Sequence, residues 1–181
     1  MSMEQSIERV LYSEETIATM VNELGRRISR DYEGKKLLLV SVLKGSVVFM
    51  ADLMRAITVP CEIDFMVVSS YGASTKTSGN VKIIKDLNID IAGYDLLIVE
   101  DILDSGVTLY TLKSMLEARK PASVKICTFL DKPERRKADI KADYVATSVP
   151  DEFIVGYGLD FDEKFRNLPY IGVLKRECYE K

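Results

Sequence analysis

One run near the middle of the chain constrains the fold more than any other segment. Residues 94–99 are almost continuously apolar, as in a strand that is covered on both faces of a parallel sheet. Two acids, Glu100 and Asp101, come next, and apolar residues then recur at helical spacing over 108–119. The pattern predicts a buried strand that ends in acidic residues and turns through a short loop into a helix.

The loop between this strand and helix has the composition of an anion site. Residues 104–108 (Asp-Ser-Gly-Val-Thr) offer hydroxyl groups and backbone N–H groups at a helix N-terminus, where the helix dipole favours negative charge. The two preceding acids are not needed to bind a phosphate, which is itself negatively charged. Together the loop and the acids predict a site for a phosphorylated sugar, whose hydroxyl groups and metal ion are held by carboxylates.

The rest of the chain alternates between strand and helix patterns. We expect a helix capped by Ser13 that stops near Gly34, and a second helix at 46–57, which is apolar on nearly all sides and therefore buried. The expected strands are 36–43, 61–69, 81–85, 123–130, 144–147, 153–157 and 170–174. This alternation predicts the α/β class, with a mostly parallel central sheet flanked by helices. No repeat or linker is visible, so we expect a single domain over 1–181.

The loops that leave the predicted strands suggest where a ligand binds. In open α/β sheets, ligands bind outside the carboxyl ends of the strands. Four polar loops are expected at that edge: 44–46, 70–80, 100–108 and 131–137. We expect them to converge on one site.

Composition excludes several classes of chemistry. The chain has no histidine, which removes the usual general base, the histidine dyads of serine and cysteine enzymes, and histidine metal sites. A metal must then be held by oxygen ligands, and Mg²⁺ suits phosphate chemistry. The net charge of −3 indicates no bulk attraction to nucleic acid or membrane. Three scattered cysteines, and the absence of a signal peptide or membrane-length apolar run, predict a cytoplasmic protein with reduced thiols.

The run 99–109 resembles the phosphoribosyl-pyrophosphate signature of the type I phosphoribosyltransferases: hydrophobic residues, two acids, two hydrophobic residues, Asp, Ser or Thr, Gly, any residue, Thr. Further segments stand in the order seen in hypoxanthine-guanine phosphoribosyltransferases, and the resemblance extends from about residue 11 to residue 175. These segments are 43–46, 70–72, 130–133, 153–160 and 162–170.

The resemblance implies transfer of ribose 5-phosphate from phosphoribosyl pyrophosphate to N9 of hypoxanthine or guanine, which forms IMP or GMP and releases pyrophosphate. It implies Mg²⁺ as cofactor, a homodimer or homotetramer, and a small hood formed largely by the C-terminal segment. The transition state should resemble an oxocarbenium ion, so catalysis consists mainly of positioning and of neutralising the developing charge.

The strand-to-helix loop supplies the first set of implied roles. Asp104 belongs to the phosphoribosyl-pyrophosphate site and is the candidate general base toward N7 of the purine. Glu100 and Asp101 hold the ribose hydroxyls and Mg²⁺, although adjacent strand residues face opposite sides and one acid could be structural. Asp104 could also be a plain N-cap of the following helix. The 5-phosphate is bound by Ser105, Gly106, Val107 and Thr108.

Other loops supply the pyrophosphate contacts and the lid. Lys44, Gly45 and Arg166 are implied in pyrophosphate binding, and the peptide before Lys44 can be cis in the family. Ser70 and Tyr71 begin the lid that excludes water from the reaction. The plain alternative for the lid is a hairpin tip without contacts.

The purine contacts come from the last third of the chain. Lys132, a donor only, faces the 6-oxo group and disfavours adenine. Phe153 stacks on the base, although a Phe in an apolar strand is more often part of a core. The backbone carbonyl of Ile154 faces the 2-position, and Asp160 lies in the purine site and is a second magnesium contact. The neighbouring basic residues 135–137 are expected to be a solvated turn.

Two other functions stay open at this point. A regulatory RNA-binding protein of the same superfamily would keep the phosphate loop but needs a basic face, and the negative net charge argues against it, as do Lys132 and Phe153. A transferase that prefers xanthine or guanine is the second alternative. That choice depends on the pocket around the 2-position at 154–160.

Overall fold

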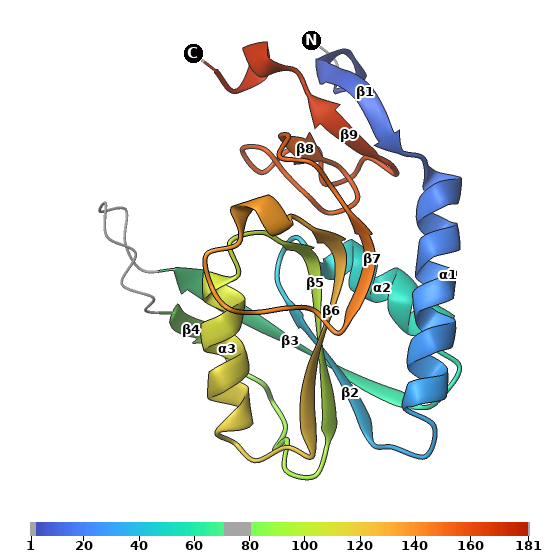
Figure 1. Cartoon of the computed structure of the whole chain (residues 1–181), viewed down its shortest axis with the longest axis vertical. Helices are drawn as coiled ribbons and strands as arrows, with labels where there is room; N and C mark the ends of the chain where they lie inside the picture. Colours follow the sequence, from blue (N-terminus) through green and yellow to red (C-terminus); the bar gives the residue numbers. More distant parts are fainter. Residues whose placement is uncertain (1–2, 71–80, 181) are drawn as a thin grey trace.

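The computed structural model describes residues 3–70 and 81–180. Its main sheet has the strand order β4-β3-β2-β5-β6-β7 (Figure 1). Every neighbouring pair is parallel except β3 and β4, which form an antiparallel edge. The predicted α/β class and mostly parallel sheet are therefore confirmed. The strands are β2 (Leu37–Val42), β3 (Cys61–Ser70), β4 (Val81–Lys85), β5 (Asp95–Leu103), β6 (Ser123–Asp131) and β7 (Tyr144–Ser148).

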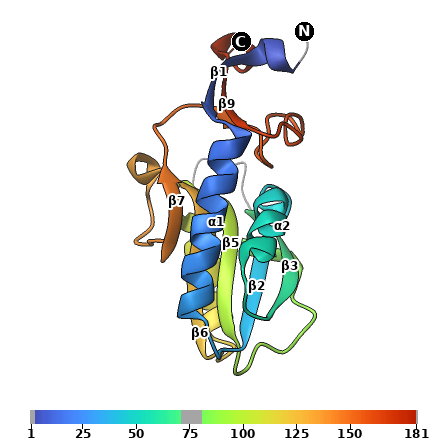
Figure 2. The ribbon, with the colours of Figure 1, turned by 90° about the vertical axis from the view of Figure 1, so that its right-hand side faces the viewer.

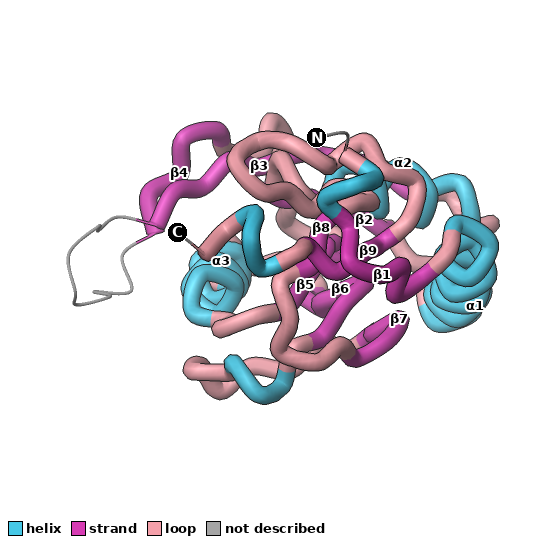
Figure 3. Tube along the Cα trace, turned by 90° about the horizontal axis from the view of Figure 1, so that it is seen from above, coloured by secondary structure: helices cyan, strands magenta, loops and turns pink. Residues whose placement is uncertain are grey.

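Helices cover both faces of this sheet, because successive strand residues are apolar and point to opposite sides. Leu37 and Leu39 of β2 pack in the same core as α1 (Glu14–Asp31) and α2 (Val47–Ala56). Leu38 and Val40 pack instead in the core that contains α3 (Val107–Glu117). Figure 2 shows α1 and α2 side by side on one face, and Figure 3 shows α3 on the other side of the sheet.

The first helix forms as the sequence predicts. The hydroxyl of Ser13 accepts a hydrogen bond from the backbone N–H of Thr16 at 3.3 Å, which caps the helix. The helix ends at Asp31, and Gly34 follows with a positive φ of 72°. Its buried stripe contains Ile17, Val21, Leu24 and Ile28.

The second helix is less buried than its composition indicates. Phe49, Met50 and Leu53 face the core, but Val47 and Arg55 are exposed. The expectation of burial on nearly all sides is therefore wrong. The reason is that α2 packs mainly against α1 and the sheet, while the residues between these contacts, such as Val47 and Arg55, face outward.

A second, three-stranded sheet forms the hood (Figure 1). Its order is β1-β9-β8, all antiparallel, with β1 (Ile7–Tyr12), β8 (Ile154–Val155) and β9 (Ile171–Leu174). The N-terminal strand was not predicted, so the hood combines both ends of the chain. The strand expected at 153–157 is shorter because positive φ angles from Gly156 to Gly158 turn the chain. Short 3-10 helices occur at Glu4–Ser6, Pro133–Arg135 and Arg176–Cys178.

Two further expectations concern the environment of the chain. Cys61, Cys127 and Cys178 form no disulfide, and burial raises the pKa of the Cys127 thiol. Within residues 3–70 and 81–180, no helix is long and apolar enough to cross a membrane.

Candidate active site

A cavity of about 500 Å³ lies between the carboxyl end of the main sheet and the hood. Side chains from distant parts of the sequence line it, including five that the sequence analysis singled out. They are Asp104, Lys132, Phe153, Ile154 and Asp160. The loops after β5 and β6 thus converge, as expected, and the hood closes the space above them.

Asp104 follows β5 and lines the cavity. It is not the N-cap of α3, because that position is taken by Gly106, whose φ is 77°. The Oδ1 atom of Asp104 is buried and has no hydrogen-bond partner within the described residues, and Oδ2 lies 3.9 Å from Nη1 of Arg135. A buried acceptor without a donor is costly unless a ligand supplies one. The N-cap interpretation of Asp104 is therefore wrong.

The predicted phosphate loop forms the turn into α3. Ser105 precedes Gly106, and Val107 and Thr108 open the helix, which has no side-chain cap. A Cβ added to Gly106 would lie 2.5 Å from Cγ2 of Ile140, so the turn needs glycine both for its left-handed φ and for space. The free helix N-terminus is thereby left open to an anion.

Of the two acids near the end of β5, Asp101 lies against the loop that follows β2. A Cβ added to Gly45 would lie 1.9 Å from Oδ2 of Asp101, and the Leu43–Lys44 peptide is cis. Burial raises the pKa of Asp101 to about 6. Burial, together with the charge of Asp101, raises the pKa of Glu100 well above its usual value. Two crowded carboxylates with raised pKa values form a place where a cation is favourable.

A loop from the hood reaches the same region. Arg166 contacts Oδ1 of Asp160 at 2.9 Å and donates to the carbonyl of Gly158 at 2.8 Å. Its Nε is buried without a hydrogen-bond partner within the described residues, so one donor remains available. The side chain of Lys44 forms an exposed ion pair with Glu163 at 3.0 Å.

Lys132 and Phe153 also line the cavity. Only 8% of the Lys132 side chain is exposed, and its Nζ donates to the carbonyl of Glu152 at 2.7 Å. Burial lowers the pKa of Lys132, and the charge of Arg135 lowers it further. Phe153 is 38% exposed, so the interpretation as a core residue is wrong. Its ring is stacked with Tyr179 at 4.7 Å.

Several residues of this site were not predicted from the sequence. Ile102 lines the cavity between the acids and Asp104, and Tyr179 lines it from the C-terminal segment. Arg135 contacts Asp151 at 2.5 Å and also lines the cavity. Ile102 could have been identified, because it lies two residues after Glu100 and two before Asp104 in or beside β5 and so shares their side of the strand. No local pattern marks Arg135, Asp151 or Tyr179.

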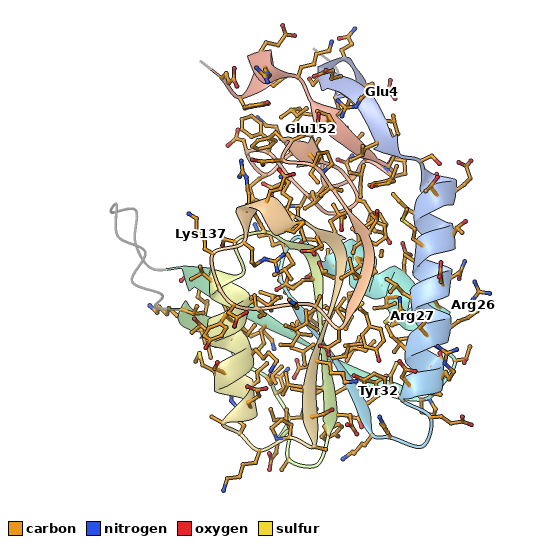
Figure 4. The ribbon with its side chains drawn as sticks, viewed as in Figure 1. Glu4, Arg26, Arg27, Tyr32, Lys137 and Glu152 are labelled. Atoms are coloured by element: carbon orange, nitrogen blue, oxygen red, sulfur yellow. The ribbon has the colours of Figure 1, made fainter. Side chains whose placement is uncertain are left out.

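The expected solvated turn at 135–137 is only partly correct. Lys137 is exposed and extends outward from this segment (Figure 4). The side chain of Arg136 is only 16% exposed and donates four hydrogen bonds, so the expectation is wrong for that residue. Of the predicted lid, Ser70 is the last residue of β3, while Tyr71 and the rest of the segment to Asn80 lie outside the described residues.

Known proteins resemble this chain over most of its length. A family model described as the phosphoribosyl transferase domain matches residues 10–162. The chain is 56% identical over 179 residues to a hypoxanthine-guanine phosphoribosyltransferase of Streptococcus thermophilus, which covers 99% of both chains. A hypoxanthine phosphoribosyltransferase structure from Staphylococcus aureus gives a TM-score of 0.97 at 51% identity, covering 99% of this chain and 97% of that chain. A hypoxanthine-guanine phosphoribosyltransferase structure from Bacillus anthracis gives 0.90 at 51% identity, covering 93% and 99%.

Proposed function

The chain belongs to the phosphoribosyl transferase family, and within it to the hypoxanthine-guanine phosphoribosyltransferases; from this premise we infer that it is a purine-salvage enzyme. It transfers the 5-phosphoribosyl group of phosphoribosyl pyrophosphate to N9 of hypoxanthine or guanine. The products are IMP or GMP and pyrophosphate.

The observation that carries this proposal is the pairing of Asp104 with Lys132 in one cavity. Asp104 presents a buried oxygen that has no donor, and Lys132 presents a buried ammonium group. A 6-oxopurine satisfies both, since its imidazole ring can offer an N–H at N7 and its 6-oxo group accepts from the ammonium. Adenine would present an amino group to Lys132, and two donors facing each other cannot form a hydrogen bond.

Asp104 acts as general base for the imidazole proton, since a carboxylate is the available acceptor in a chain without histidine. Phe153 stacks on the purine, with Tyr179 against its ring. Ile154 and Asp160 line the same cavity. The backbone carbonyl of Ile154 binds at the 2-position, and Asp160 belongs to the purine site.

The sugar-phosphate side of the site uses backbone groups and charge. The turn of residues 105–108 binds the 5-phosphate through backbone N–H groups and hydroxyls at the start of α3. The backbone of Lys44 and Gly45 and the side chain of Arg166 bind the pyrophosphate. These groups neutralise the charge that develops on the leaving group, while Ser70 and Tyr71 begin a lid that excludes water.

The acids at the end of β5 fit Mg²⁺. The residues that the structure describes contain no cluster of three metal-ligating side chains, which suits an ion that keeps water and substrate phosphates among its ligands. Glu100 and Asp101 supply oxygen donors, and Asp160 a further one. When bound, Mg²⁺ stabilises the negative charge on the leaving pyrophosphate.

The remaining features follow from family membership. We propose a single domain over residues 1–181, a homodimer or homotetramer, and a cytoplasmic location. Nucleic acid and membranes are not among its partners.

The test is nucleotide formation from each purine base with phosphoribosyl pyrophosphate and Mg²⁺, followed by separation of the products. We expect IMP from hypoxanthine and GMP from guanine, no AMP from adenine, and no product without Mg²⁺. Failure with both 6-oxopurines would refute the proposal. A filter-binding assay with structured RNA tests the regulatory alternative, and xanthine as substrate tests the other transferase.

A further inference from the structure

The segment after β6 contains a guanidinium group that no role in substrate binding explains. Arg136 donates from Nε to the carbonyl of Asp104 at 3.0 Å, from Nη2 to that of Leu103 at 3.1 Å, and from Nη1 to that of Ile140 at 2.8 Å. It also forms an ion pair with Asp131. Arg136 therefore joins the loop after β5 to the loop after β6.

Backbone groups of the same segment extend this contact. The N–H of Lys132 donates to the carbonyl of Leu103 at 3.0 Å, and the N–H groups of Lys137 and Ala138 donate to that of Ser105 at 2.9 and 3.2 Å. The carbonyls of residues 103–105 thus all face the segment after β6. Three successive peptide groups have the same orientation.

This orientation fixes the direction of the neighbouring N–H groups. In a planar trans peptide, the carbonyl of one residue and the N–H of the next point in opposite directions. The N–H groups of Asp104, Ser105 and Gly106 consequently point away from the segment after β6. Successive N–H groups on one side of a turn form a concave anion site, or nest. The nest lies directly before the N-terminus of α3, which adds its own dipole.

We propose that Arg136 is a positioning residue for the phosphoryl group: it holds the carbonyls of residues 103 and 104 outward and so keeps the N–H groups of the nest directed at the 5-phosphate. The inference rests on the proposed function and adds a residue that touches no substrate. Through Asp131, which precedes Lys132, the same side chain couples the phosphate and purine ends of the site.

The contribution of Arg136 is the arrangement of its donors, and not its charge alone. Its planar fork serves acceptors on several sides at once, whereas a lysine ammonium on a flexible stem is a point charge. Arg136→Lys keeps the charge and therefore separates the two explanations. Arg119→Lys is the matched control, because Arg119 forms two bonds to Asp86 at 2.8 and 2.9 Å, is also partly buried, and lies outside the site.

The experiment measures binding of inorganic phosphate and of phosphoribosyl pyrophosphate by calorimetry, and the KM of each substrate. We expect Arg136→Lys to weaken phosphate and phosphoribosyl-pyrophosphate binding by about tenfold to a hundredfold, as for the loss of groups that orient a site. The KM for hypoxanthine should change less, and Arg119→Lys should leave all four values unchanged. In Arg136→Ala, added guanidinium ion should restore part of the phosphate affinity, whereas ammonium ion should not.

Phosphate affinity at the wild-type level in a folded Arg136→Lys variant would overturn the inference, as would an equal loss in Arg119→Lys. The proposed function and the positioning role of Arg136 can be refuted separately. If the wild type binds phosphate but makes no nucleotide, the proposed function fails while the effect of Arg136 on phosphate affinity is still measured. If the wild type makes nucleotide and Arg136→Lys binds phosphate normally, only the positioning role fails.

Discussion

Gly45→Ala isolates the coupling between the loop after β2 and the acids at the end of β5. A Cβ at residue 45 would lie 1.9 Å from Oδ2 of Asp101 and 2.9 Å from its Cγ, whereas ordinary contacts begin at 3.4 Å. The carboxylate oxygen must therefore retreat by about 1.5 Å, which is the difference between these distances. The atom that yields is the end of a side chain, so the backbone can stay in place.

The two consequences of this retreat differ in size. Asp101 loses the bond in which the N–H of Ile102 donates to Oδ1 at 2.8 Å, which costs about 1 kcal/mol. Alanine in place of glycine returns roughly 0.4–1 kcal/mol by restricting the unfolded chain, so the free energy of unfolding changes little. A misplacement of about 1 Å in a positioned site costs about a hundredfold in rate, or roughly 2.7 kcal/mol of transition-state stabilisation.

The assay combines thermal unfolding with steady-state kinetics. We expect Gly45→Ala to unfold within a few degrees of the wild type, while kcat/KM for phosphoribosyl pyrophosphate falls by about a hundredfold. Gly34→Ala is the matched control, because no atom lies within 4 Å of its Cβ position but its φ of 72° disfavours alanine. It should lower Tm by about 2–4 °C through roughly 1 kcal/mol of backbone strain and leave the kinetics intact. Wild-type kinetics in Gly45→Ala would refute the coupling.

Three further predictions concern the purine end of the site. Asp104→Asn should lower kcat by about 10²–10⁴-fold while phosphoribosyl-pyrophosphate binding changes only a few-fold; normal turnover would exclude Asp104 as base. The pKa of Lys132 is lowered, so its ammonium group loses its proton at a lower pH than an ordinary lysine does. Arg135→Gln removes a neighbouring positive charge and should raise the pKa of Lys132, measured by an NMR titration of its ε-carbon. An unchanged or lower pKa would contradict this. Tyr179→Ala should raise the KM for hypoxanthine by about 2- to 10-fold and Tyr179→Phe should not, because the stacking on Phe153 needs only the ring; equal effects of both changes would point to the hydroxyl.

Much of the main sheet could be predicted because each of its strands and helices is indicated by a pattern of neighbouring residues in the sequence. The continuous apolar runs of β2 and β5 require cover on both faces. An apolar segment follows β2 and a segment with helical spacing follows β5, and both form helices that supply part of that cover. The hood was less accessible to sequence reasoning. β1 is short and has no buried residue, and β8 has only two residues, so neither has a clear alternation of apolar and polar residues. Their structure depends on β9, which pairs with both of them.

The candidate site divides in the same way. The acids and the phosphate loop lie on one contiguous segment, so the pattern at 99–109 contains the residue types and their order. Arg135, Asp151 and Tyr179 come from separate segments, and their contacts join residues that are distant in the sequence. Sequence reasoning could place the strand ends together, but it could not place side chains from the hood opposite them.

The basic run at the end of β6 shows why residue type alone does not determine a role. Lys132, Arg135, Arg136 and Lys137 look alike in the sequence, yet one is buried in the cavity, one lies at its rim, one holds backbone carbonyls and one is exposed. Arg136 differs from Lys137 in that backbone carbonyls of Leu103 and Asp104, far earlier in the chain, lie within reach of its side chain. Those carbonyls face it because β5 and β6 are parallel neighbours whose ends are in register, with Leu103 opposite Asp131. The role of Arg136 is therefore a consequence of strand pairing, and a substitution that shifts the end of β6 should impair phosphate binding as removal of the guanidinium does.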